Sequence, residues 1–345
     1  MERRTGATNV ERATGDDRNT TGGERRRSSA YDAARERVAF RRRHERGVLR
    51  AAGKDRLEWL QGLLTNDVRS FGGPGWAYAA WLTPQGRMIT DVTAIETGDE
   101  TWLDVPAPLV RTLAEKLDLM VFAEDVRIED VSDRIVGVTV QGPAAWNGLS
   151  RLIPARPALD RGGIAIVRDE GDPLVVVRTR SGPDAHIVYS STTRAAGVEE
   201  SLAHGGATPL DDETAETLRI EAGIPRFLVD MTDETIPLEA NLDHAISHTK
   251  GCYVGQEIIV RIRDLAKGRV ARRIVGLLPE GEAVPAVGTA VLADGRAVGR
   301  ITSATWSPAL QRPIAMAVVH RDSTAAGTVV AVNDATAIVT PLPFV

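Results

Sequence analysis

The sequence predicts an α+β protein in which mixed sheets are interspersed with helices and a small β-barrel follows at the C-terminal end. Two segments with the composition of strands are direct neighbours, at 76–82 and 88–96. An amphipathic helical pattern follows over 107–123. Neighbouring strands without an intervening helix argue against the strict strand-helix alternation that is typical of a parallel sheet.

The composition is that of an ordinary soluble globular chain. The 345 residues are 43% hydrophobic and 26% charged, which leaves room for two or three domains with substantial cores. No run of about 18 apolar residues is present, so we expect no membrane segment and a cytoplasmic location. The single cysteine rules out both an intrachain disulfide and an iron-sulfur or zinc site built from four cysteines.

Charge is distributed unevenly along the chain. Residues 1–46 contain thirteen arginines and eight acids, a balance of +5, so the other 299 residues carry −10 of the total of −5. An acidic body argues against a broad nucleic-acid-binding surface. Residues 1–30 are nearly devoid of apolar side chains, and we expect a disordered tail. For the Arg-rich stretch 35–46 we expect a solvated, partly helical lead-in, and binding of an anionic group is the alternative.

The remaining chain divides into two regions. Residues 31–267 form the α+β region, with two interleaved subdomains, and residues 268–345 form the barrel. Asp294-Gly295 is the strongest hairpin signal in the chain. The expected barrel strands lie at 273–278, 291–299, 301–305, 314–319, 329–332 and 337–340.

Two acidic residues of the α+β region occupy informative positions. Asp91 lies on the strand 88–96, after a turn over 83–87, and its local alternative is an exposed strand residue. Glu221 falls on the last turn of a helix over 211–222 that Gly223 closes. A carboxylate there opposes the helix dipole, so we expect it to have a specific partner. The local alternative is a surface glutamate paired with Arg219 or Arg226.

The only cysteine lies in the stretch Lys250-Gly251-Cys252-Tyr253-Val254-Gly255-Gln256-Glu257. A nearby cation such as Lys250 lowers the pKa of a thiol, and the glycines allow a shaped loop. The alternative is a small buried hydrophobe. The apolar residues 258–262 that follow predict a strand or helix start that anchors the loop.

This stretch resembles the K-G-C-Y-x-G-Q-E signature of the YgfZ family, relatives of the glycine-cleavage T-protein that assist iron-sulfur enzymes. The resemblance extends from about residue 45 to the C-terminus, through the L-T-N-D of 64–67, the R-x-E-x-G of 219–223, the P-x-E-x-x-L of 237–242 and the terminal barrel. It implies two mixed α+β domains around a central opening that holds tetrahydrofolate or a derivative.

The resemblance also implies roles for individual residues. Glu221 would hold the pterin ring, whose 2-amino and N3–H groups suit a carboxylate. Asp91 would lie at the reactive N5/N10 edge, although the glycine-glycine and double-aspartate pattern of the T-protein is absent around it. Cys252 would act as a thiolate beside Lys250. The remaining cofactor contacts would be Tyr253, Gln256, Glu257 and Arg261, with Glu239 and Asn241 as lesser candidates.

Two functions follow from this. The first is a folate-binding factor that assists assembly or repair of iron-sulfur clusters, including those of tRNA-modifying radical enzymes, with transient cluster enzymes or carriers as partners. The alternative is a folate-dependent aminomethyltransferase or a one-carbon-transferring demethylase, which needs an acid or base but no thiol. We expect no metal site, because His244 and His248 lack a third ligand.

Overall fold

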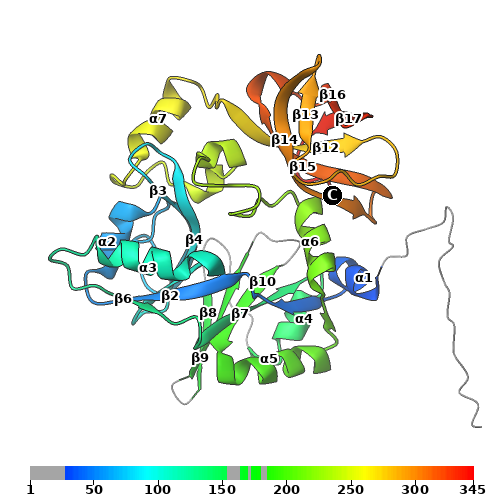
Figure 1. Ribbon diagram of the computed structural model, residues 1–345. Coiled ribbons are helices and arrows are strands. Elements are labelled where there is room, and N and C mark those ends of the chain that lie inside the picture. Colours follow the sequence, from blue (N-terminus) through cyan, green and yellow to red (C-terminus); the bar gives the residue numbers. More distant parts are fainter. Residues whose placement is uncertain (1–27, 154–163, 170–171, 180–184) are drawn as a thin grey trace, which may run out of the picture.

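The computed structural model describes residues 28–153, 164–169, 172–179 and 185–345. Two sheets and a closed barrel make up this part of the chain (Figure 1). The first sheet has the strand order β11-β1-β7-β10-β9-β8 and the second the order β3-β4-β5-β2-β6. The α+β class with a C-terminal barrel is therefore confirmed.

Almost all strand pairs within the two sheets are antiparallel, and the pair β1 with β11 is parallel. The strands of the first sheet are β1 (Ala39–Arg42), β7 (Ile135–Gln141), β8 (Ile164–Asp169), β9 (Asp172–Arg178), β10 (His186–Ser191) and β11 (Thr208–Pro209). Those of the second are β2 (Arg46–Ala52), β3 (Gly75–Leu82), β4 (Met88–Glu96), β5 (Thr101–Pro106) and β6 (Arg127–Asp130). Since β1 and β2 belong to different sheets, residues 43–45 cross from one sheet to the other.

Four of the described helices pack against the two sheets. The helices are α1 (Ser29–Glu36), α2 (Arg56–Leu63), α3 (Val110–Asp118), α4 (Ala145–Leu149), α5 (Thr192–His204), α6 (Asp212–Glu221) and α7 (Gln256–Asp264). Helices α2 and α3 share a core with the second sheet, and α4 and α5 share one with the first. A third core, which includes Val48, Trp102 and Tyr189, lies between the sheets.

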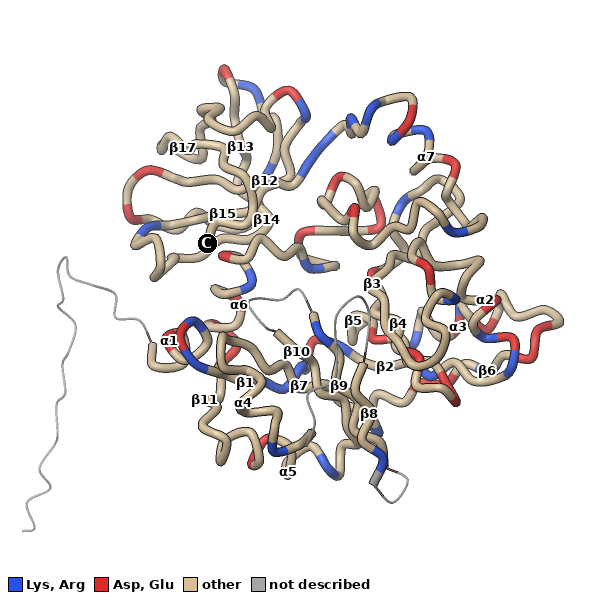
Figure 2. Tube along the Cα trace, turned by 180° about the vertical axis from the view of Figure 1, so that it is seen from behind, with Lys and Arg blue, Asp and Glu red and all other residues tan. Residues whose placement is uncertain are grey.

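The barrel closes in the order β12-β15-β14-β13-β16-β17. Its strands are β12 (Arg272–Pro279), β13 (Ala290–Ala293), β14 (Arg296–Ser307), β15 (Arg312–His320), β16 (Val329–Val332) and β17 (Ala335–Thr340). Asp294 and Gly295 both have positive φ and join β13 to β14, as the hairpin signal predicts. Figures 1 and 2 both place α6 between the barrel and the sheets.

The N-terminal part of the fold differs from the prediction. Residues 29 and 30, assigned to the tail, belong to α1, which begins after the N-cap Ser28 and packs on α6. The stretch 35–46 is not a solvated lead-in, because it contains β1 and its arginines pair with carboxylates far along the chain. The predicted tail up to residue 27 lies outside the described residues.

The predicted helix over 107–123 is shorter than expected. It ends at Asp118, five residues early, after a 3-10 turn at Ala107–Leu109. Within the described residues, no helix is long and apolar enough to cross a membrane.

Candidate functional site: a cavity between the sheets and the barrel

A cavity of about 1630 Å³ is bounded by both sheets, α6 and the C-terminal segment. Its volume exceeds the roughly 300–1,000 Å³ of typical small-molecule sites. Among the residues that the structure describes, seven arginines and five carboxylates line it, a formal balance of +2 in a chain of net charge −5. The cavity is therefore large enough for an extended ligand, and its charge favours an anionic one.

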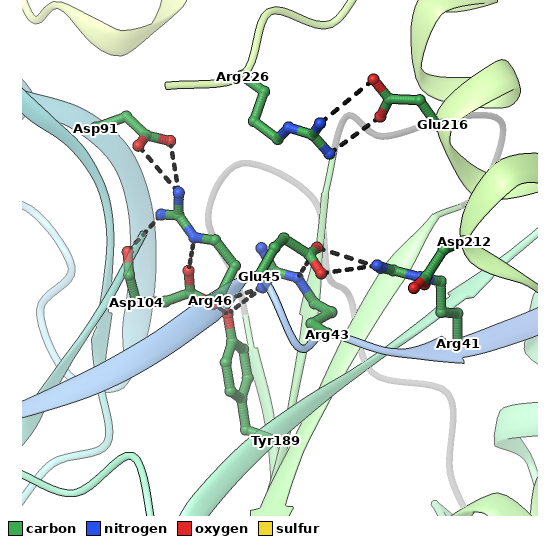
Figure 3. Close-up of polar contacts among 10 residues, drawn as sticks. All are labelled: Arg41, Arg43, Glu45, Arg46, Asp91, Asp104, Tyr189, Asp212, Glu216 and Arg226. Atoms are coloured by element: carbon green, nitrogen blue, oxygen red, sulfur yellow. Dashed lines mark hydrogen bonds and ion pairs between the residues drawn. The ribbon is translucent and has the colours of Figure 1, made fainter. Parts of the chain in front are cut away.

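The Asp91 carboxylate lies in the wall of this cavity (Figure 3). Its side chain is 8% exposed. Arg46 donates from Nη1 to both carboxylate oxygens, at 2.9 and 3.0 Å, and the Tyr78 hydroxyl donates to Oδ2 at 3.1 Å. Asp91 is consequently a fixed carboxylate rather than an exposed strand residue.

Asp104 of β5 organises the polar groups behind Asp91. It accepts hydrogen bonds from Arg46 Nε at 2.5 Å, Arg43 Nη1 at 2.5 Å and the Tyr189 hydroxyl at 2.6 Å. Burial raises the pKa of Asp104, but the charges of Arg43 and Arg46 and the Tyr189 hydroxyl outweigh it, so the pKa is lowered. Asp104 therefore stays ionised and anchors the two arginines.

Tyr78 of β3 also lines the cavity. Its ring stacks on His244, with 5.7 Å between the centroids. The Asn66 amide links the two residues by donating to the carbonyl of Tyr78 at 2.8 Å and to that of His244 at 3.2 Å. Burial, and then the charge of Asp91, raises the pKa of Tyr78 well above 10, so its hydroxyl stays protonated and donates to Asp91.

Arg226 and Glu216 face each other on another part of the wall (Figure 3). Arg226 Nη1 lies 3.0 Å from Glu216 Oε2, and the Arg226 side chain is 38% exposed. Glu216 also accepts from Arg219, at 2.8 and 2.9 Å. Arg226 is therefore the more accessible of the two cations for a ligand carboxylate.

Glu221 does not lie in the cavity wall, where Ala222 and Gly223 stand instead. Its side chain is fully buried. The carboxylate accepts hydrogen bonds from the Tyr31 hydroxyl, at 2.8 Å to each oxygen, from Ser307 Oγ at 2.5 Å, and from Arg35. This placement argues against the pterin contact expected for Glu221, because its acceptors are occupied inside the protein. It is not a surface glutamate either.

The cysteine loop contributes no residue to the lining of the cavity. Cys252 is exposed, and none of the loop and α7 candidates, Tyr253, Gln256, Glu257 and Arg261, lines the cavity. The loop instead packs on the turn between β3 and β4, where a Cβ on Gly255 would lie 2.5 Å from the Thr83 carbonyl oxygen. The structure thus separates Cys252 from Asp91 rather than bringing them into one site, and residues 258–262 are helical.

Lys250 has a structural set of partners. Its Nζ donates to three carbonyls at the end of α2, those of Gln61 at 2.7 Å, Leu64 at 2.7 Å and Asn66 at 2.9 Å. Burial lowers the pKa of Lys250 to about 8. Its charge is therefore directed at the helix terminus and not at the Cys252 thiol, contrary to the sequence-based expectation.

The two lesser candidates diverge. Asn241 lines the cavity and donates from its side chain to the Ile274 carbonyl at 2.9 Å, whereas Glu239 does not line it and accepts from the Ile236 amide at 3.1 Å. Among the described residues, no three His, Cys, Asp or Glu side chains gather as a metal site would require.

Sequence reasoning missed the residues that hold Asp91. Arg43 and Arg46 belong to the Arg-rich stretch, and Tyr78 lies on a segment that was predicted only as a strand. The available signal was the density of arginines immediately before a buried strand, since buried cations need paired carboxylates.

The fold and this cavity define an α+β protein with a C-terminal barrel and a large cavity between the sheets and the barrel. Residues 26–250 match the GCVT N-terminal domain and residues 272–345 match the glycine cleavage T-protein C-terminal barrel domain. The chain belongs to the glycine cleavage T-protein family.

Relatives and a solved structure agree with this family. An aminomethyltransferase of Geobacillus kaustophilus is 30% identical over 331 residues, which cover 91% of this chain and 89% of the relative. One of Thermus thermophilus is 31% identical over 304 residues, 87% and 84% of the two chains. The crystal structure of glycine cleavage system aminomethyltransferase T from Bartonella henselae superposes with a TM-score of 0.81 at 21% identity, and covers 92% of this chain and 88% of that one.

Proposed function

We propose that this protein binds tetrahydrofolate in the cavity between the sheets and the barrel. It would act there as an aminomethyltransferase, passing a one-carbon unit to the bound tetrahydrofolate. The observation that carries the proposal is the Asp91 carboxylate, held in the cavity wall by Arg46 and Tyr78. The aminomethyltransferases among its relatives favour this activity over the iron-sulfur role that the sequence first suggested.

The residues of the cavity fit the cofactor in size and charge. The cavity volume of about 1630 Å³ leaves space beside an extended ligand, and the formal balance of +2 suits the carboxylates of a glutamyl tail. Arg226 lies on an accessible part of the wall, and it is our candidate residue to bind one of those carboxylates. When bound, tetrahydrofolate would supply the nitrogen that accepts the one-carbon unit.

The chain's own contribution would be electrostatic. Transfer of an aminomethyl group develops positive charge at the carbon that moves, and a preorganised carboxylate stabilises such charge without reorganising. Asp91 meets this requirement because three hydrogen bonds fix its orientation before any ligand arrives. A fixed carboxylate at this site could also accept a proton from a bound ligand.

The test is an assay of tetrahydrofolate-dependent aminomethyl transfer with purified protein and an aminomethyl donor. We expect Asp91→Asn to lower kcat by about 10²-fold or more while the protein remains folded, by analogy with removal of other electrostatic groups. Cys252→Ser should leave kcat unchanged, since Cys252 lies outside the cavity. Full activity of Asp91→Asn, or no transfer by the wild-type chain, would contradict the proposal.

A second candidate function rests on Cys252. The thiol is exposed in a loop similar to the K-G-C-Y-x-G-Q-E signature, as a cysteine that meets a partner protein would need to be. In this alternative the protein binds folate and assists iron-sulfur enzymes or cluster carriers. The two functions are separated by measuring the activity of a cluster-dependent enzyme in cells that carry Cys252→Ser. Loss of that activity supports the second function, whatever the result of the aminomethyl-transfer assay. Wild-type cluster activity excludes a role of the thiol.

A further inference from the structure

Arg46 uses its whole guanidinium group inside the protein. Nη1 contacts both oxygens of Asp91, Nε donates to Asp104 Oδ1 at 2.5 Å, and Nη2 donates to the Asp104 carbonyl at 2.7 Å. The Arg46 side chain is 10% exposed. A planar guanidinium group whose three nitrogens all donate hydrogen bonds is held in one orientation. Arg46 therefore holds the Asp91 carboxylate in a defined position.

The orientation of Arg46 depends on both sheets. It is the first residue of β2, directly after the crossover from the first sheet, and Asp104 lies on the neighbouring strand β5. Asp104 is itself fixed by Arg43 from the crossover and by Tyr189 from β10 of the first sheet. A chain of charge-assisted hydrogen bonds therefore runs from the first sheet through Asp104 and Arg46 to Asp91.

We propose that Arg46 is the positioning residue for Asp91, and that it fixes the direction in which that carboxylate faces the cavity. This inference rests on the proposed function of Asp91. Arg46 acts on a ligand only through Asp91, because its own N–H groups are directed at carboxylate and carbonyl oxygens of the protein.

Removal of Arg46 would leave Asp91 in an unfavourable setting. The groups that face Asp91 are Arg46 from β2 and Tyr78 from β3, with Asp104 from β5 behind Arg46 and His244 behind Tyr78. Without the guanidinium, Asp91 would be a buried carboxylate with one hydroxyl donor and another carboxylate nearby. The two hydrogen bonds from Nη1 that fix its direction would be lost with the guanidinium.

The experiment is ¹³C NMR, at one fixed pH, of protein labelled at the aspartate carboxyl carbons, with the Asp91 resonance assigned by its loss in Asp91→Asn. We expect the Asp91 resonance to move in Arg46→Gln, because the carboxylate loses both hydrogen bonds from Arg46 Nη1. Arg42→Gln is the matched control, because Arg42 pairs with Glu199 outside the cavity and should leave the Asp91 resonance at its wild-type position. An unmoved Asp91 resonance in folded Arg46→Gln would overturn the inference.

A kinetic readout distinguishes positioning from a general structural role. In Arg46→Gln, kcat for aminomethyl transfer should fall while KM for tetrahydrofolate stays unchanged, because Arg46 acts on a ligand only through Asp91; a raised KM with unchanged kcat would count against positioning. If Arg46→Gln does not fold, Arg46→Lys serves the same NMR comparison, because a single ammonium cannot reproduce the bonds of the guanidinium to both carboxylates. The NMR comparison needs no activity, so it can support the Arg46 inference even where the transferase assay fails. An unmoved Asp91 resonance with an active enzyme refutes the inference alone.

Discussion

The buried Glu221 allows a sharp test of where the carboxylates of this protein act. Glu221→Gln keeps the shape of the side chain but removes the charge that pairs with Arg35 and accepts from Tyr31 and Ser307. Hydrogen bonds to a charged group contribute roughly 1.5–3 kcal/mol each. Breaking a buried pair costs roughly 3–5 kcal/mol. Because Arg35 is 22% exposed and regains water, we expect about 3 kcal/mol.

A loss of this size should lower the Tm by roughly 5–10 °C. The assay is thermal and urea unfolding followed by circular dichroism, alongside a titration with tetrahydrofolate at a temperature where the variant is folded. The control is Glu213→Gln, an exposed acid on the same helix, which should change the Tm by less than about 1 °C. A stable Glu221→Gln that has lost tetrahydrofolate binding would refute this reasoning and restore the pterin contact.

Three further outcomes follow from the structure. Burial and the hydrogen bond to Glu221 raise the pKa of Tyr31 to about 12, above its unfolded value near 10. The free energy of unfolding should therefore fall as the pH rises from about 10 through 12. Unfolding of Tyr31→Phe, measured over the same pH range, should lack this contribution. Lys250→Met should lower the free energy of unfolding by about 2–3 kcal/mol in urea titrations, because three carbonyls lose a donor. An unchanged urea midpoint of unfolding would contradict this structural role of Lys250. Native protein should react with one equivalent of a thiol reagent, since Cys252 is exposed, and failure to react without denaturant would contradict this.

The features that the sequence predicted are those set by local chemistry. The Asp294-Gly295 turn needs only two residues that tolerate positive φ, and the end of α6 before Gly223 needs only one. The strands β3 and β4 follow from their strand-forming composition and from the turn over 83–87 that joins them. The class of fold could be predicted from such segments because each carries its own signal.

The site depends on contacts that no local pattern contains. Asp104 is separated from Arg46 by 58 residues and from Tyr189 by 85, so a run of arginines gave no indication of its partners. The same holds for Glu221, whose partner Tyr31 is 190 residues away. Lys250 was assigned to the thiol two residues away, whereas its hydrogen bonds reach back 184 to 189 residues. Pairing in three dimensions decided each of these roles.

The most direct test of the central claim is a calorimetric titration of the full chain with tetrahydrofolate, compared with a variant whose cavity is filled. Thr139 lines the cavity on β7, and Thr139→Trp would project an indole into it at a strand position that tolerates aromatic residues. We predict one binding site in the wild-type chain and at least tenfold weaker binding in Thr139→Trp, with the Tm preserved. Absence of binding to the wild-type chain, or equal affinity in the variant, would contradict the placement of folate in this cavity.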